Sequence, residues 1–221
     1  MGGLVEFFLK GGPFMYPLLL WSIMVVGFFI ERLITFLRSR KVEEIRRITD
    51  QVIDMINRDV PLDELERTCR RFGRMEGEVL SEGIARFRFI STEERTPEEM
   101  RAELNGTVER SSLGYFRRYL DVVNFLASTS VLLGLLGTVR GMIVAFAQIA
   151  EKGLGEPTIV ARGISEALIT TVTGLSIAVP ALAIYAYFDG RATTKAIQFE
   201  PYGHLFVDAL MRRWGRMKQA A

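Results

Sequence analysis

Three long stretches of the sequence carry no charge, and they limit the folds that the chain can adopt. They run from Pro13 to Ile30, from Val122 to Val139 and from Ala167 to Phe188. A helix over each would be ~27–33 Å long, which is enough to cross the hydrocarbon core of a bilayer. Most of the 28 basic and 26 acidic residues lie elsewhere, although the net charge is only +2. This segregation predicts an all-α membrane protein with three transmembrane helices and a helical soluble domain.

The second and third stretches each contain an irregularity. Arg140 separates the second stretch from a further apolar segment that ends at Ala150. A helix over Val122–Ala150 would be ~43 Å long, so one end should protrude into water. Pro180 lies inside the third stretch, where we expect it to kink the helix.

Lysine and arginine are unevenly distributed around the spans, and this predicts the orientation of the chain. They are frequent after the first span, before the second and after the third, whereas the opposite side has only Lys10, Lys152 and Arg162. We therefore expect an inner-membrane protein with a periplasmic N-terminus and a cytoplasmic C-terminus. The expected segments are a short outer N-terminus (1–12), three spans (13–37, 121–150 and 163–188), a cytoplasmic helical domain (38–120), a short periplasmic loop (151–162) and a cytoplasmic C-terminal helix (189–221).

The cytoplasmic segments have helical signals. Apolar residues recur at helical spacing from Val42 to Ile56. Thr96, Pro97 and Glu99 form the pattern of a capping box with proline at the first helical position. The helix that begins there could run into the second span, although glycines at 106 and 114 weaken it. The C-terminal helix could break at residues 201 and 203, a proline and a glycine.

Several function classes find little support. With one cysteine, Cys69, and one histidine, His204, a Cys/His metal site is not expected. No paired carboxylates, nucleophile–base set or phosphate loop appears, so we expect neither an enzyme nor a cofactor. The basic run from Arg70 to Arg74 could contact phosphates, but a solvated helix face explains it, and we expect no nucleic-acid partner.

Polar residues within the spans allow two interpretations. Glu166 either faces a cavity or partner at membrane depth, or lies at the interface near Arg162, one turn earlier. Four threonines are expected ~12–16 Å below the outer surface. Their hydroxyls could line an aqueous path, or could simply bond to the backbone of their own helices. Helical geometry does not choose which of them would face a pore. The four are Thr138, Thr170, Thr171 and Thr173.

Small residues form a stripe along each of the last two spans, and such stripes allow close approach of helices. One chain with three helices can hardly use both stripes internally, so we infer a homo-oligomer. No span contains an aspartate, and a proton path normally needs a titratable carboxylate. If the protein moves protons, a partner subunit supplies that group. The stripe residues proposed for helix packing include Gly134, Gly137, Gly141, Gly174 and Ala178.

The spans themselves carry a family resemblance. The segment from Gly11-Gly12-Pro13 to Glu31-Arg32-Leu33, the motif from Leu133 to Met142 and the motif from Gly163 to Ala181 resemble the three spans of ExbB and TolQ proteins. The likeness covers all three spans in order, and identifies the chain as similar to the MotA/TolQ/ExbB proton-channel family. Having three spans rather than four favours the ExbB/TolQ branch.

The resemblance implies a mechanism. Family members form pentamers around single-span partners resembling ExbD or TolR, and an aspartate of the partner carries the proton. By motif position, Thr138 and Thr171 match the pore threonines of the family and Glu166 matches its third-span glutamate. Thr170, Thr173 and Pro180 remain candidates for lining the pore or supporting a kink.

The expected function is thus that of a proton-channel stator subunit, which drives an envelope process such as outer-membrane import or envelope integrity. A TonB-like or TolA-like protein and the membrane lipids are further expected partners. A passive oligomeric scaffold and a motility stator are the alternatives. Arg140 departs from the family, which often has tryptophan there, and Val131 replaces a common proline.

Overall fold

The computed structural model describes residues 2–152 and 157–220, and the regular structure in these ranges is entirely α-helical. Three of its helices are long and apolar enough to cross a membrane. The prediction of an all-α protein with three candidate spans is therefore confirmed. The chain divides into two compact units, the first made of Met1–Leu33 and Tyr119–Phe188, and the second of Ile34–Arg118 and Asp189–Ala221.

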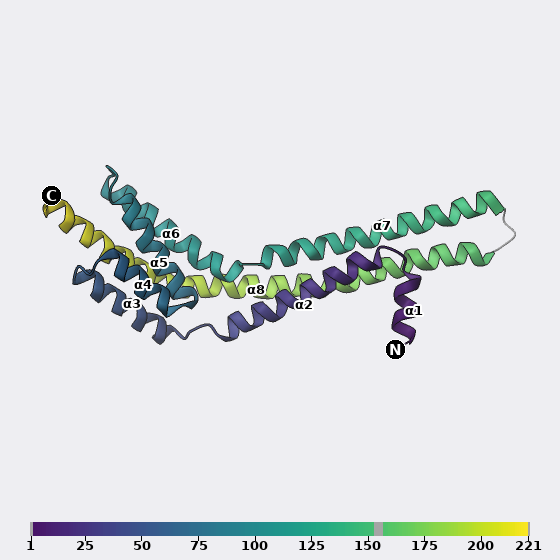
Figure 1. Cartoon of the computed structure of the whole chain (residues 1–221), viewed down its shortest axis with the longest axis horizontal. Coiled ribbons are helices and arrows are strands. Elements are labelled where there is room, and N and C mark those ends of the chain that lie inside the picture. Colours follow the sequence, from purple (N-terminus) through teal and green to yellow (C-terminus); the bar gives the residue numbers. More distant parts are fainter. Residues whose placement is uncertain (1, 153–156, 221) are drawn as a thin grey trace. The chain divides into compact units, whose positions relative to one another are not determined.

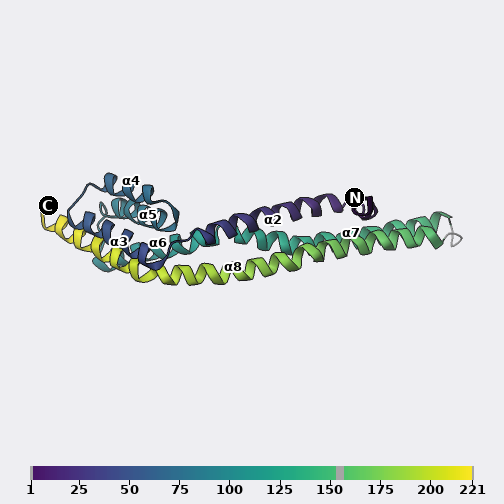
Figure 2. The ribbon, with the colours of Figure 1, turned by 90° about the horizontal axis from the view of Figure 1, so that it is seen from below.

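The first unit holds the three candidate spans. It contains α1 (Gly2–Lys10), most of α2 (Met15–Leu37), α7 (Leu120–Lys152) and the first part of α8 (Pro157–Ala220). Helices α7 and α8 run antiparallel and side by side in both ribbon views (Figures 1 and 2). Of the loop expected at 151–162, residues 153–156 lie outside the described ranges. The flanking residues 151–152 and 157–162 belong to the two helices.

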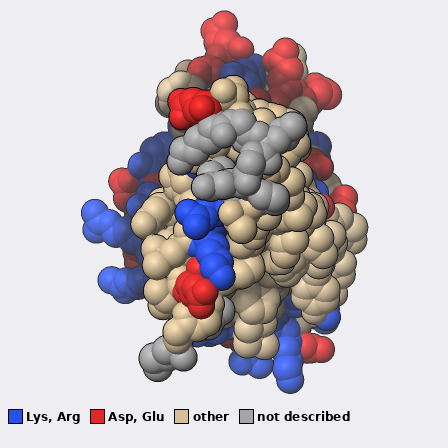
Figure 3. Space-filling view, turned by 90° about the vertical axis from the view of Figure 1, so that its right-hand side faces the viewer, with Lys and Arg blue, Asp and Glu red and all other residues tan. Residues whose placement is uncertain are grey.

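Apolar packing joins α2 to α7 and α8 in this unit. Val25, Val123, Leu126 and Ala181 form a buried cluster. Large apolar side chains nevertheless stay exposed along all three helices, and at most 28% of each span window is buried. Uncharged residues cover most of the surface at the end of α7 and α8 that faces the viewer in Figure 3. An apolar exterior of this kind suits lipid or other membrane helices rather than water.

The second unit is a bundle with its own core. It contains α3 (Val42–Asn57), α4 (Leu62–Phe72), α5 (Arg74–Ile90), α6 (Pro97–Arg117) and the later part of α8. Four phenylalanines from α5, α6 and α8 are buried in this core, and the helical pattern of α3 directs its apolar residues into it. These residues are Phe87, Phe116, Phe199 and Phe206, with Ile45, Ile48, Val52 and Ile56 of α3.

The ends of two helices differ from what the sequence suggested. Helix α6 does not continue into the second span, and the helix stops at Arg117 rather than at either glycine. Arg118 has extended backbone and Tyr119 a positive φ of 66°. The Tyr119 ring stacks on Phe28 at 5.4 Å between centroids, so tertiary packing fixes this break. Helix α8 runs on through Pro201 and Gly203 to Ala220, so the breaks suggested at these two residues are absent.

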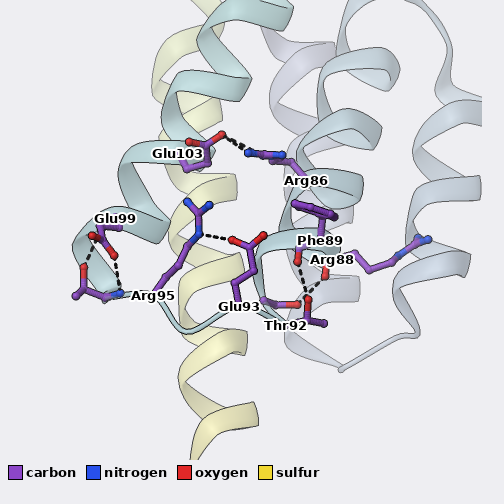
Figure 4. Close-up of polar contacts among 10 residues, drawn as sticks. Arg86, Arg88, Phe89, Thr92, Glu93, Arg95, Glu99 and Glu103 are labelled. Atoms are coloured by element: carbon purple, nitrogen blue, oxygen red, sulfur yellow. Dashed lines mark hydrogen bonds and ion pairs between the residues drawn. The ribbon is translucent and has the colours of Figure 1, made fainter.

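The capping box of α6 forms as the sequence predicts. Thr96 Oγ1 accepts a hydrogen bond from the Glu99 backbone N–H at 3.2 Å, and the Glu99 carboxylate accepts one from the Thr96 N–H at 3.0 Å (Figure 4). These bonds lower the pKa of the Glu99 carboxyl below its usual value. Nearby ion pairs, Glu93 with Arg95 and Arg86 with Glu103, hold the same connection between α5 and α6 (Figure 4).

Replacing Thr96 with alanine should therefore destabilise the second unit. We expect a loss of about 1 kcal/mol, because one N-terminal N–H of α6 loses its acceptor. Thermal unfolding of the full chain in detergent, followed by circular dichroism, measures the change. Thr92→Ala is the matched control, because the exposed Thr92 hydroxyl only donates to the Phe89 carbonyl. Equal effects of the two substitutions would contradict the capping role.

Cys69 is fully buried in the core of the second unit. Burial raises the pKa of its thiol to about 12, and the nearby Glu66 carboxylate adds to the shift. The reactive form of a cysteine is the thiolate, so the folded chain keeps this group in its unreactive form at neutral pH.

We expect a thiol reagent to label native Cys69 roughly a thousandfold more slowly than the unfolded chain, since each pKa unit changes the thiolate fraction tenfold. The unfolded thiol loses its proton near its ordinary pKa of 9.0, whereas the folded one keeps it. Stability from this group is thus complete below pH 9 and is lost as the pH rises above it. Rapid labelling at neutral pH without unfolding would refute this.

Candidate functional site

The small residues of α7 and α8 let the two helix backbones come into direct contact. A methyl group added at Gly174 would lie 2.5 Å from the Ser130 carbonyl oxygen, and one added at Gly134 would lie 3.2 Å from Thr171 Cα. Further along the pair, a methyl group at Gly141 would lie 2.8 Å from the Gly163 carbonyl oxygen. The observed helix separation therefore leaves no room for a side chain at Gly174 and Gly141, and little room at Gly134.

This packing overturns one inference from the sequence. The two stripes face one another within a single chain, so they need no second copy to explain them. Ala178, which was proposed for packing, is buried as well. A homo-oligomer remains an expectation, but it no longer rests on the stripes.

Thr170 and Thr171 lie next to each other in sequence but have different partners. Thr171 Oγ1 donates to the Gly134 carbonyl on the neighbouring helix, at 3.0 Å. Thr170 is buried against Gly137, and its hydroxyl donates to the Ala167 carbonyl of its own helix at 2.8 Å. The Thr171 hydroxyl is thus the one that ties the two helices together.

The remaining two threonines bond within their own helices. Thr138 Oγ1 donates to the Leu135 carbonyl at 2.6 Å, and Thr173 Oγ1 donates to the Ile169 carbonyl at 2.8 Å. Thr138 is half-exposed and stands one turn from Gly134, the residue whose carbonyl Thr171 binds. Thr138 and Thr171 therefore lie at neighbouring levels of the α7–α8 pair. Pro180 is exposed on α8.

Glu166 forms an ion pair across the helices. Its Oε1 lies 2.5 Å from Arg140 Nη1, and 23% of the Glu166 side chain is exposed. The sequence had suggested Arg162 as the partner on the same helix, and the structure places Arg140 of α7 there instead. A depth count does not reveal the pair, because Arg140 lies 10 residues from the outer end of the expected second span, at residue 150, and Glu166 lies only 3 from that of the third, at residue 163.

The turn between α1 and α2 closes over this ion pair. Gly12 has a φ of +72°, and an added methyl group there would overlap the Glu166 carboxylate. A methyl group at Gly11 would lie 2.8 Å from Ile169 Cγ2. Only glycine readily combines that backbone conformation with so close an approach. Glu166 therefore faces the start of α2 rather than open solvent.

The sequence also failed to identify a hydrogen bond between α2 and α7. Trp21 Nε1 donates to Thr129 Oγ1 at 2.7 Å. Next to it, the buried Ser130 hydroxyl donates to the Leu126 carbonyl. Trp21 and Thr129 belong to no charged pattern and are 108 residues apart in the sequence, so no local pattern indicates their contact.

We expect the Arg140–Glu166 pair to stabilise the α7–α8 contact by about 1 kcal/mol, the range of partly exposed ion pairs. Arg140→Gln and Glu166→Gln should each lower the stability of the full chain, and the exchanged pair R140E/E166R should recover most of it. A double-mutant cycle of thermal unfolding measures the coupling. The exposed Glu6–Lys10 pair is the control, and equal coupling at both sites would argue against a special role.

Comparison with known proteins agrees with the motifs in these helices. The model of the MotA/TolQ/ExbB proton channel family matches residues 73–201. The ExbB-like 1 biopolymer transport protein of Synechocystis sp. is 32% identical over 188 residues, which cover 82% of this chain and 69% of that protein. The ExbB homologue of Methanothermobacter thermautotrophicus is 30% identical over 86% of this chain and 64% of its own length.

Two further similar proteins share less with this chain. The Tol-Pal system protein TolQ of Haemophilus influenzae is 35% identical over 54% of this chain and 54% of its own length. A solved structure of MotAB from C. jejuni aligns with a TM-score of 0.44 at 20% identity, over 87% of this chain and 69% of that one. The chain thus spans about half to two thirds of the length of these relatives.

Proposed function

We propose that this chain, which belongs to the MotA/TolQ/ExbB proton channel family, forms the proton channel of an ExbB/TolQ-type stator. The three candidate spans and the ExbB and TolQ relatives make it a multi-pass protein of the inner membrane. The proposal concerns what the spans do there and which other protein they require.

The placement of Thr138, Thr171 and Glu166 carries the proposal. Two hydroxyl groups lie at neighbouring levels of α7 and α8, since Thr171 donates to the Gly134 carbonyl and Thr138 lies one turn from Gly134. Glu166 is the only carboxylate in residues 122–150 and 163–188, and it is already engaged by Arg140. A group in an ion pair is a poor shuttle, so the carboxylate that takes up and releases each proton comes from a partner.

The partner fits the description of an ExbD/TolR-like subunit with one span and a membrane aspartate. In this proposal five copies of the chain surround the partner helices, with Thr138 and Thr171 of each copy beside the aspartate. The exposed apolar faces of α7 and α8 supply the surface for such an assembly. The driven process is an envelope task such as outer-membrane import or envelope integrity, through a TonB-like or TolA-like protein.

Proton flux through a reconstituted complex tests the proposal. The chain would be purified with its proposed ExbD/TolR-like partner and placed in vesicles, and proton entry would be followed with an internal pH-sensitive dye. We expect inward flux under a proton gradient, and its loss when the partner aspartate is replaced by asparagine. A passive scaffold, the alternative function, would give a complex without flux, and a cellular activity that an uncoupler does not reduce.

A further inference from the structure

A cavity of about 320 Å³ in the second unit has strongly basic walls. Three cations line it from three separate segments: Arg38 follows α2, Arg74 begins α5 and Lys195 lies on α8. Within the described ranges, none of the three has an ion pair with a carboxylate. Like charges brought together without counter-charges repel one another, so an anion in the cavity would be stabilising.

The remaining charges of the cavity do not neutralise these cations. Glu76 is buried there, but its carboxylate lies 3.2 Å from Arg40 Nη1. Arg40 also donates to the Phe72 carbonyl at 2.8 Å and pairs with Glu44. The charges of Arg40 and Glu76 thus compensate one another, and their contacts hold this wall of the cavity in place. Arg38, Arg74 and Lys195 therefore leave a local excess of three positive charges.

The start of α5 adds donors to the same cavity. Arg74, Met75 and Glu76 are its first residues, and all three line the cavity. Gly73 provides no side-chain cap, so the first N–H groups of this helix suit an anion. Arg74 has a φ of 55°, which is costly for a residue other than glycine and typical of functional sites.

The cavity also has an apolar side. Ile34 of α2 and Phe116 of α6 line it together with the cations. Ile34 lies in the last turn of a candidate membrane span, Met15–Leu37. A phosphate group attached to an acyl-bearing glycerol would meet cations and apolar side chains in this arrangement, as in basic headgroup pockets at the ends of spans.

We propose that this cavity binds a phosphate group through Arg38, Arg74 and Lys195. The phosphate belongs to an anionic phospholipid headgroup or is free phosphate. Such a ligand would fasten the end of α2 to α5 and α8 within the second unit. This site does not depend on proton transfer, and it would exist whether or not the proposed channel function is correct.

Native mass spectrometry of the full chain in detergent, titrated with phosphatidylglycerol or phosphatidylcholine, tests this site. We expect preferential binding of phosphatidylglycerol, and about a hundredfold weaker binding in R38Q/R74Q/K195Q. R47Q/R67Q/R212Q is the matched control, because it removes three exposed arginines of the same unit outside the cavity. If the control keeps its affinity for phosphatidylglycerol, binding depends on the three cations of the cavity and not on positive charge in general.

The source of the phosphate is decided by competition. Displacement of phosphatidylglycerol by inorganic phosphate would assign the site to a free phosphate, whereas no displacement would assign it to the lipid. Equal binding of phosphatidylglycerol to the two triple variants would overturn the proposal.

A second experiment applies if R38Q/R74Q/K195Q fails to fold. The unaltered chain is then cross-linked to a photoactivatable phosphatidylglycerol. Cross-links at residues 34–40 and 74–76 support the site, and cross-links only elsewhere refute it.

Discussion

Replacing Thr171 with valine is expected to abolish proton-driven activity while the chain still folds and assembles. Valine has nearly the same shape as threonine, so the contact of α8 with Gly134 keeps its packing. The hydroxyl that donates to the Gly134 carbonyl is lost, and with it a polar group of the proposed pathway. We expect proton flux to fall on the order of a hundredfold, the scale of losing one positioned proton-transfer group.

Flux measurements on three variants show whether the effect belongs to this hydroxyl. Thr138→Val should behave like Thr171→Val, because Thr138 is the other threonine of the proposed pathway and lies one turn along α7 from Gly134. Thr173→Val is the control, because Thr173 is not one of the two threonines of the proposed pathway, and it lies on the same helix as Thr171 with its hydroxyl donating to the Ile169 carbonyl. Co-purification with the partner measures assembly separately from flux. Unchanged flux in both the Thr138 and Thr171 variants, with assembly intact, would refute the proposed role.

How much of this site can be predicted from the sequence depends on the kind of interaction involved. The spans were predictable because hydrocarbon excludes charge, and a run without charge is visible in one dimension. The Thr96 cap was predictable because all its atoms lie within four residues. The Arg140–Glu166 pair was not found because its members are separated by 26 residues, and two helices must be placed before they meet.

Small-residue patterns illustrate the same limit. Glycine spacing identifies the face of a helix that can approach a neighbour, but it does not name the neighbour. The stripes on α7 and α8 looked too extensive for one chain, and yet each is the partner of the other. The break at Tyr119 is similar, because its positive φ is tied to packing on Phe28 rather than to a local glycine or proline.

The contact between those stripes predicts the largest loss of stability, at Gly174. In Gly174→Ala the new methyl group would lie 2.5 Å from the Ser130 carbonyl oxygen and 3.2 Å from Gly134 Cα. Both are backbone atoms, so no side chain can rotate to relieve the overlap and the helices must separate. We expect a cost of about 3 kcal/mol, the upper part of the range for overpacking.

Two further glycines turn this expectation into an ordered series. At Gly137 the added methyl group would overlap Thr170 Oγ1 and lie 2.6 Å from Thr170 Cβ. The backbone of α8 fixes this Cβ, and Thr170 is buried, so Gly137→Ala should be costly as well. Gly27 has open space around it, and Gly27→Ala should be neutral or stabilising by up to about 1 kcal/mol. Thermal unfolding in detergent ranks the stabilities of the three alanine variants.

Flux distinguishes the Gly174 variant from the Thr171 variant. Separation of the helices would also break the hydrogen bond between Thr171 and Gly134, so Gly174→Ala should lose flux together with stability, whereas Thr171→Val loses flux alone. Equal stability of the three alanine variants would mean that α7 and α8 do not pack backbone to backbone.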